Sequence, residues 1–122
     1  MRPIDLDTIN FEFGAYDVAP DPFSKLERLA HAILRVLRQN PDEVFLVEGY
    51  TDAVGSEEDN LSLSDRRAET VAQILTESFG VPPENLVTQG YGEQHLKIET
   101  ADAERANRRV ALRRITPLMG ER

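Results

Sequence analysis

Apolar residues occur along the chain in short runs that predict four strands. In residues 9–13 they alternate with polar residues, which is the period-two pattern of a half-buried strand. Residues 44–47 form a continuous apolar run, which is typical of a strand covered on both faces. A third strand is expected at 86–90. The run at 44–47 should therefore be central, and parallel to the first strand because a helix connects the two.

The last strand is expected at 107–115, where the alternation of apolar and polar residues returns. Successive side chains of a strand point to opposite faces of its sheet. Val110 and Leu112 therefore share one face with Arg108, whereas Arg109 belongs to the other face.

Two stretches with apolar residues at helical spacing predict the helices that connect these strands. In the first, Asp21 is the expected N-cap, Pro22 takes the first helical position and Asn40-Pro41 ends the helix. The apolar stripe that faces the sheet consists of Phe23, Leu26, Ala30, Ile33 and Leu37.

The second helix is expected to begin at Asn60 or Ser62, because either side chain can accept hydrogen bonds from the first backbone N–H groups. Residues 53–59 then form an acidic loop. Gly80 is the expected C-cap, and a brief further helix is expected at 100–106. The buried face of the second helix consists of Ala68, Val71, Ala72, Leu75 and Phe79.

Composition narrows the classes of function. A chain of 122 residues with 40% apolar and 30% charged residues predicts one soluble globular domain. The absence of cysteine excludes disulfides, zinc-thiolate sites and thiol nucleophiles. A net charge of −8 argues against nucleic acid as a partner, because phosphate binding needs clustered basic residues. No apolar run approaches the ~20 residues that cross a bilayer, and residues 1–20 carry no secretory signal pattern.

The sequence predicts no metal site, no cofactor and no catalytic centre. The acidic loop at 53–59 lacks the alternating oxygen ligands and the glycine and glutamate positions of a calcium loop. The two histidines, His31 and His95, lie outside the region in which the other candidate residues cluster. No matched nucleophile and base is therefore available for hydrolysis.

Asp52 and Arg67 are the strongest candidates for a binding site. Asp52 follows the central strand, at the edge of the sheet where ligands of α/β proteins usually bind. Arg67 precedes Val71 by one helical turn and leans toward the packed side, whereas Arg66 should face solvent. A carboxylate and a guanidinium at one sharp turn can hold a zwitterion. The alternative is an ion pair that joins strand to helix, and the two interpretations are compatible.

A set of spaced motifs resembles the OmpA-like peptidoglycan-binding domain, the type found at the C-terminus of OmpA and MotB and in peptidoglycan-associated lipoproteins. The pattern is Gly-x-Thr-Asp-x-x-Gly, Asn, Leu-Ser-x-x-Arg-Ala, Gly-Tyr-Gly and Asn-Arg-Arg-Val, in that order. The matching residues are Gly49, Thr51, Asp52, Gly55, Asn60, Leu63, Ser64, Arg67, Ala68, Gly90, Tyr91, Gly92, Asn107, Arg108, Arg109 and Val110.

The resemblance implies an α+β fold, an α/β sandwich with the order βαβαβ(α)β. In it a mixed four-stranded sheet packs against two main helices. The OmpA-like domain should span residues 9–116, with an N-terminal extension at 1–8 and a C-terminal tail at 117–122.

The resemblance also implies a function, namely non-covalent binding of peptidoglycan that tethers an envelope protein to the cell wall. The ligand is the side-chain end of meso-diaminopimelate in the stem peptide. Asp52 takes its ammonium and Arg67 its carboxylate, while Thr51, Asn60 and Leu61 shape the pocket. Supporting roles are implied for Tyr50, Gly55, Ser64, Asn107, Arg108 and Arg109.

Several alternatives stay open at this point. A protein-interaction or stator-like module that has lost wall binding is the competing function. Arg108 or Arg109 can support the pocket or be structural, and many relatives have histidine where Tyr50 stands. On the resemblance the protein is periplasmic, with a membrane contact only through an anchor upstream of this chain, as in outer-membrane or other envelope-anchored proteins. A homodimer is one of the oligomeric states that the sequence allows.

Overall fold

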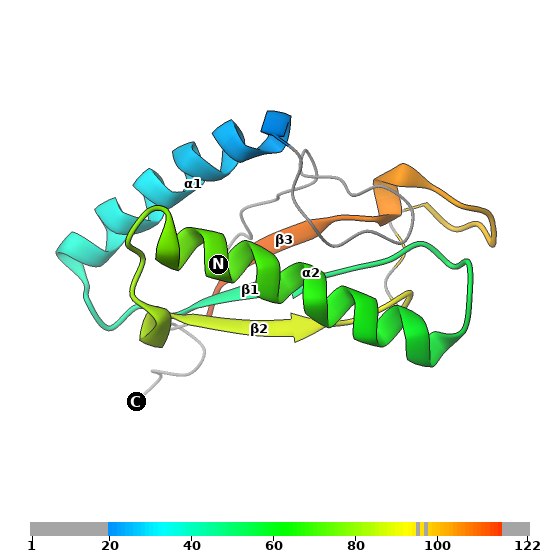
Figure 1. Ribbon diagram of the computed structural model, residues 1–122. Coiled ribbons are helices and arrows are strands. Elements are labelled where there is room, and N and C mark those ends of the chain that lie inside the picture. The colour runs from blue at the N-terminus through cyan, green and yellow to red at the C-terminus, as the bar shows by residue number, and fades with distance from the viewer. Residues whose placement is uncertain (1–19, 95, 97, 116–122) are drawn as a thin grey trace.

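The computed structural model describes residues 20–94, 96 and 98–115, and Figure 1 shows their arrangement. The strand expected at 9–13, the N-terminal extension and the tail at 117–122 lie outside the described residues. The helices and strands are α1 (Pro20–Gln39), β1 (Phe45–Gly49), α2 (Glu57–Glu77), β2 (Leu86–Gly90) and β3 (Val110–Arg114), with short 3-10 helices η1 (Pro83–Asn85) and η2 (Arg105–Asn107).

The sheet of the described chain has three strands in the order β2-β1-β3, so the apolar run at 44–47 is central, as predicted. β1 is parallel to β2 and antiparallel to β3, which makes the sheet mixed. The carboxyl ends of β1 and β2 and the first turn of α2 meet at one end of the sheet (Figure 1). The mixed α+β architecture is confirmed, and the fourth strand lies outside the described residues.

The core lies between one face of the sheet and the two long helices. Alternate residues of β1 and β3, such as Val47 and Leu112, are fully buried against apolar residues of both helices. α1 contributes most of its predicted stripe to this cluster, and α2 contributes Ala68, Val71 and Leu75. Burial of such side chains is the main force that holds α1 and α2 on the sheet.

α1 begins at Pro20, earlier than the expected start after Asp21, and it ends at Gln39 immediately before Asn40-Pro41 as expected. The expected cap is wrong because Asp21 and Pro22 lie inside the first helical turn. The first N–H groups of a helix have no partner within it, so proline costs little at these positions.

α2 begins at Glu57 and not at Asn60 or Ser62, so the expected acidic loop is in part the first turn of the helix. Ser56 is the N-cap, and its hydroxyl accepts a hydrogen bond from the backbone N–H of Asp59 at 3.1 Å. Three acidic residues in the first turn complement the positive end of the helix dipole. Because Ser56 caps the helix, the Asn60 side chain is available to form hydrogen bonds with the loop after β1.

The expected C-cap of α2 at Gly80 and the expected helix at 100–106 are also corrected. α2 is capped by Ser78, and Gly80 follows with a positive φ of 79° while its N–H donates to the carbonyl of Thr76 at 3.0 Å. Instead of a helix at 100–106 there is only η2. Thr100 accepts a hydrogen bond from the N–H of Asp102 at 3.2 Å, a local turn that competes with helix formation.

Within the described residues no helix is both long enough and apolar enough to cross a membrane.

Candidate ligand-binding site

A cavity of about 160 Å³ opens at the carboxyl end of β1, between the loop that follows this strand and the first turns of α2. This is the edge of the sheet at which ligands of α/β folds usually bind. It is lined by Thr51, Asp52, Val54, Gly55, Asp59, Asn60, Leu63, Arg67 and Arg108. The structure therefore brings together both main candidates, Asp52 and Arg67, in one cavity.

Asn60 fixes the loop that forms one wall of this cavity. Its side-chain amide is 3.3 Å from the carbonyl oxygen of Asp52 and 3.0 Å from that of Val54, and it donates to the Glu93 carboxylate at 2.8 Å. Gly55 allows the loop to turn, because its φ of 97° lies in a region that side chains disfavour. The loop thus has a defined shape, set from the second turn of α2.

Asp52 is paired with Arg108. The Arg108 guanidinium donates from Nη1 to Oδ2 of Asp52 at 2.8 Å, and the Asp52 side chain is almost fully buried. The N–H of Val54 donates to Oδ1 at 3.2 Å and the N–H of Glu104 to Oδ2 at 3.4 Å. This cationic partner of the carboxylate lies two residues before β3, whereas the sequence pointed first to Arg67.

Arg67 is completely buried, with a relative exposure of 0%, while the neighbouring Arg66 is exposed, as expected from their positions on the helix. Arg67 donates from Nη1 to the carbonyl of Tyr50 at 3.1 Å. Burial, and then the nearby charge of Arg108, lower the pKa of Arg67 to about 10, while Asp52 acts in the opposite sense. The guanidinium is therefore still charged at neutral pH.

Thr51 contributes a polar group that the described residues leave without a hydrogen bond. The side chain is 1% exposed, it lines the cavity, and its hydroxyl oxygen has no partner among them. The backbone N–H of Thr51 donates to the carbonyl of Gly92 at 2.9 Å, which fixes the residue in place. A buried hydroxyl without a partner is costly, so a polar ligand atom in the cavity would stabilise it.

Tyr50 and Arg109 form a separate cluster on the other face of the sheet. The Tyr50 ring stacks on Tyr91 with 5.5 Å between centroids, and the Arg109 guanidinium lies 3.9 Å from the Tyr50 centroid. Burial, and then the Glu48 carboxylate, raise the pKa of Tyr50 to about 12, whereas Arg109 lowers it. Neither side chain lines the cavity at Asp52, although the carbonyl of Tyr50 holds Arg67.

Ser64 and Asn107 support the loops around the cavity without lining it. The Ser64 hydroxyl donates to the carbonyl of Leu61 and accepts from the N–H of Gly92, both at 2.8 Å. Asn107 is buried and exchanges two hydrogen bonds of 2.8 Å with the backbone of Ile98. These contacts hold the loops after β2 and before β3 against the end of the sheet.

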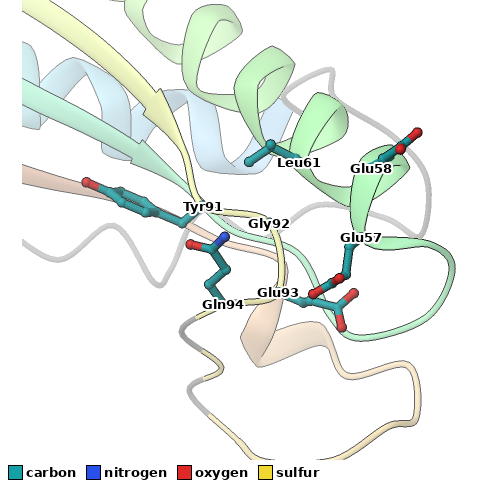
Figure 2. Close-up of a pocket in the computed structure, with 7 residues that line it drawn as sticks. All are labelled: Glu57, Glu58, Leu61, Tyr91, Gly92, Glu93 and Gln94. Carbon is teal, nitrogen blue, oxygen red and sulfur yellow. The ribbon is translucent and has the colours of Figure 1, made fainter.

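Leu61 lines a second cavity of about 170 Å³ and not the cavity at Asp52, and it is 41% exposed (Figure 2). In Figure 2 the carboxylates of Glu57 and Glu93 lie on the same side of this cavity. The lining residues are Glu57, Glu58, Leu61, Tyr91, Gly92, Glu93 and Gln94. Its acidic character makes it unsuited to an anionic group.

Sequence reasoning did not identify Val54, Asp59, Leu63 or the backbone of Glu104 as parts of the site. The first three line the cavity, and the fourth donates to Asp52. Val54 carries no signal that separates it from ordinary loop residues, whereas Leu63 is part of the Leu-Ser-x-x-Arg-Ala motif but was not predicted to line the site. Asp59 became a lining residue because α2 begins earlier than expected.

Fold and site together define a small α+β domain with a cavity lined by charged and polar side chains at the carboxyl edge of a mixed sheet. Within the described residues, no group of three or more histidines, cysteines, aspartates and glutamates is placed to hold a metal ion. The charged side chains of the cavity are instead two guanidiniums and two carboxylates.

Comparison with known proteins shows the family. The model of the OmpA family matches residues 10–109. The peptidoglycan-associated lipoprotein of Pseudomonas putida is 36% identical over 112 residues, which cover 89% of this chain and 63% of the lipoprotein. Outer membrane porin F of Pseudomonas aeruginosa is 36% identical over 109 residues, which cover 88% of this chain and 30% of the porin. This chain belongs to the OmpA family, as its motifs predicted.

A solved structure supports the same conclusion about the fold. The peptidoglycan-associated lipoprotein from Burkholderia pseudomallei superposes with a TM-score of 0.70 at 28% identity, over 84% of each chain. The chain spans only part of the two Pseudomonas relatives, 63% of one and 30% of the other. The two relatives are named as an outer-membrane porin and a peptidoglycan-associated lipoprotein, which are proteins of the bacterial envelope.

Proposed function

We propose that this domain binds peptidoglycan non-covalently through the side-chain end of meso-diaminopimelate in the stem peptide, and so tethers an envelope protein to the cell wall. The observation that carries the proposal is the cavity at the end of β1, where Asp52, Arg67 and Arg108 meet. Relatives named as peptidoglycan-associated lipoproteins, 36% identical to this chain, support peptidoglycan as the polymer that is bound.

The chemistry of the ligand matches the groups that line the cavity. The end of diaminopimelate carries an ammonium and a carboxylate on one carbon. A guanidinium such as that of Arg67 can bind the carboxylate with two parallel hydrogen bonds, and Asp52 can accept one from the ammonium. The hydroxyl of Thr51 adds a hydrogen bond from the wall of the cavity. Asn60 fixes the loop but directs its amide toward protein atoms.

The affinity of one such site is expected to be modest. Each hydrogen bond to a charged group contributes about 1.5–3 kcal/mol, and ordering and desolvation reduce the sum. The wall presents many copies of the same group, and a protein held near it rebinds readily. Weak single sites are therefore sufficient for a tether. An anchor upstream of the domain would hold it in the periplasm, at the outer membrane or elsewhere in the envelope.

Retention on insoluble peptidoglycan from a Gram-negative bacterium tests the proposal. The wild-type chain should sediment with the polymer, and Arg67→Gln should reduce retention at least about tenfold, because a hydrogen-bonded charge is lost. Asp52→Asn should also weaken retention. Arg66→Gln is the matched control, since it removes the same charge from an exposed position on the same helix.

Circular dichroism of each variant separates loss of binding from loss of fold. Equal retention of wild type, Arg67→Gln and Arg66→Gln would contradict the proposal and favour a protein-interaction or stator-like module. A wild-type chain that stays in the supernatant would contradict it as well.

A further inference from the structure

The outer face of α1 carries a line of basic side chains, in a chain whose net charge is −8. They recur at three- and four-residue spacing, which places them on one face of the helix, and each is exposed. Glu27 is exposed beside Arg28 and offsets one of these charges. Within the part of the chain that the structure describes, the three guanidiniums of this line form no ion pair. The basic stripe consists of Arg28, His31, Arg35 and Arg38.

A third cavity opens at one end of the basic stripe. Its volume is about 290 Å³, against about 160 Å³ for the cavity at Asp52, and Arg38 belongs both to the stripe and to the lining. Apart from Arg38 and Asn85 the lining is apolar, so the cavity suits an apolar side chain. The lining residues are Leu34, Leu37, Arg38, Pro41, Gly80, Pro82 and Asn85.

This third cavity lies at the end of the domain opposite to the cavity at Asp52. Pro41 precedes β1 and Pro82 precedes β2, so the third cavity is at the amino ends of these parallel strands (Figure 1). The side-chain amide of Asn85 donates to the carbonyl of Pro41 at 2.9 Å and to that of Glu43 at 2.8 Å, which joins the walls. The cavity is therefore formed by the fold itself, and a partner bound there leaves the cavity at Asp52 open.

We propose that the basic stripe and the third cavity form a docking surface for an acidic segment of another protein, with one apolar side chain of that segment in the cavity. Guanidiniums bind carboxylates with two parallel hydrogen bonds. Exposed ion pairs alone contribute little, and an apolar anchor in a formed pocket supplies the remaining affinity. This inference concerns a separate surface and goes beyond the proposed function.

Two other occupants fit these observations less well. An anionic membrane is an extended flat surface, so it would leave the cavity empty and would meet the net charge of −8 as well as the stripe. A narrow segment stays close to the stripe, and physiological salt screens charges beyond about 8 Å. A second copy of this chain would offer Glu57, Glu58 and Glu93, but these line a hollow of their own, and two hollows do not interlock.

Fluorescence anisotropy with synthetic peptides tests the inference on the full chain. Two labelled helical probes carry glutamate at every third or fourth position along one face and a single phenylalanine at one end or the other. The tighter of the two is the reference peptide. At low ionic strength it should bind at least about tenfold more tightly than a version with alanine for phenylalanine, and than one with glutamine for every glutamate. Absence of binding by both phenylalanine probes would overturn the inference.

A charge reversal then tests the stripe. Arg35→Glu should weaken binding of the reference peptide at least about fivefold, because attraction near the middle of the stripe becomes repulsion. Arg66→Glu is the matched control, since it makes the same change of charge at an exposed position of α2, and it should alter the affinity by less than about twofold. Equal effects of the two variants would show a response to overall charge only and would overturn the assignment of the stripe.

Gly80→Asn tests the cavity. The φ of Gly80 is 79°, which asparagine tolerates better than most residues, and an added Cβ would meet nothing within 4 Å. The new side chain should occupy part of the cavity, so the preference for phenylalanine over alanine in the peptide should fall to within about threefold. Circular dichroism checks the fold. A folded Gly80→Asn protein with the full wild-type preference would refute the role of the cavity, and if the variant does not fold, the peptides and Arg35→Glu decide.

Vesicles of phosphatidylglycerol and phosphatidylethanolamine test the membrane as the alternative. The wild-type chain should not sediment with them at physiological salt. Sedimentation that Arg35→Glu abolishes, without binding of either phenylalanine probe, would overturn the inference in favour of an anionic membrane. None of these measurements uses the cell wall, so failure of the proposed function would leave their result unaffected.

Discussion

Adjacent residues of one motif have different tasks in this domain, as Arg108 and Arg109 show. Arg108 forms the ion pair with Asp52 in the cavity, and Arg109 packs against the Tyr50 ring on the other face of the sheet. The alternation of a strand explains the division, because neighbouring side chains point to opposite faces. The same alternation gave a usable signal in the sequence, since Arg108 shares its face with the buried residues Val110 and Leu112.

The phenol of Tyr50 should lose its proton at a higher pH than that of an ordinary tyrosine. Burial and the nearby carboxylate of Glu48 raise its pKa to about 12, so the folded protein should release this proton only at strongly alkaline pH. The near-ultraviolet absorbance of phenolate measures the titration, and Tyr50→Phe should remove the step near pH 12. A titration of the wild type that is complete well below that pH, with the fold intact, would contradict the prediction.

The raised pKa of Tyr50 also has a consequence for stability. Between pH 10.0 and about 12 the unfolded chain loses this proton while the folded protein keeps it, so this contribution to stability is lost as the pH rises. Arg67 acts in the opposite sense over alkaline pH, because its pKa is lowered to about 10 and the unfolded chain holds that proton longer. The two contributions offset each other, and for that reason the direct titration is the clearer measurement.

At the scale of elements, the start of α2 positions the site. Because the helix begins after Ser56, Asn60 falls in its second turn, from which its side chain reaches the loop after β1. Sequence reasoning could not locate this start, since Ser56, Asn60 and Ser62 are all residue types that cap helices well. The start of the helix depends on tertiary contacts, because the Asn60 amide is bound to the loop after β1 and to Glu93 and does not cap the helix.

Substitution of Ser56, the observed cap, and of Ser62, an expected one, should therefore have different effects. Ser56→Ala should lower the free energy of unfolding by about 1 kcal/mol, because the N–H of Asp59 loses its acceptor. Ser62→Ala lies on the exposed surface of the helix and should change stability by less than about 0.5 kcal/mol. Urea unfolding at neutral pH measures both. A larger effect at Ser62 than at Ser56 would contradict the position of the cap.

The strands were the more predictable elements. The apolar run at 44–47 and the short run at 86–90 carry their own signal, and β1 and β2 lie where these runs predicted. The ion pair of Asp52 with Arg108 was harder to predict from the sequence, because the two residues are 56 positions apart and only the folded chain shows that they meet. Arg67 was found because its helical spacing relative to Val71 placed it on the packed side.

At the scale of the whole molecule, the domain boundary predicted by the sequence can be tested by truncation. The alternating residues 9–13 predict a strand, and β3 has one edge that no described strand covers. Removal of residues 1–8 should leave the free energy of unfolding within about 0.5 kcal/mol of the full chain. Removal of residues 1–15 should lower it by several times that amount, because the strand predicted at 9–13 is removed together with its apolar side chains. Equal stability of the two truncated chains, measured in urea, would place the boundary elsewhere.

The loop after β2 is held by three neighbours at once. The carbonyl of Gly92 accepts a hydrogen bond from the N–H of Thr51, and its N–H donates to the hydroxyl of Ser64. The side-chain amide of Asn60 donates to the carboxylate of Glu93. A receptor already fixed in this way is preorganised, so capture of a ligand should cost little conformational entropy. Encounter with the wall should then be followed directly by attachment, without a slow rearrangement between the two, and the lifetime of the tether should depend on how quickly the ligand leaves.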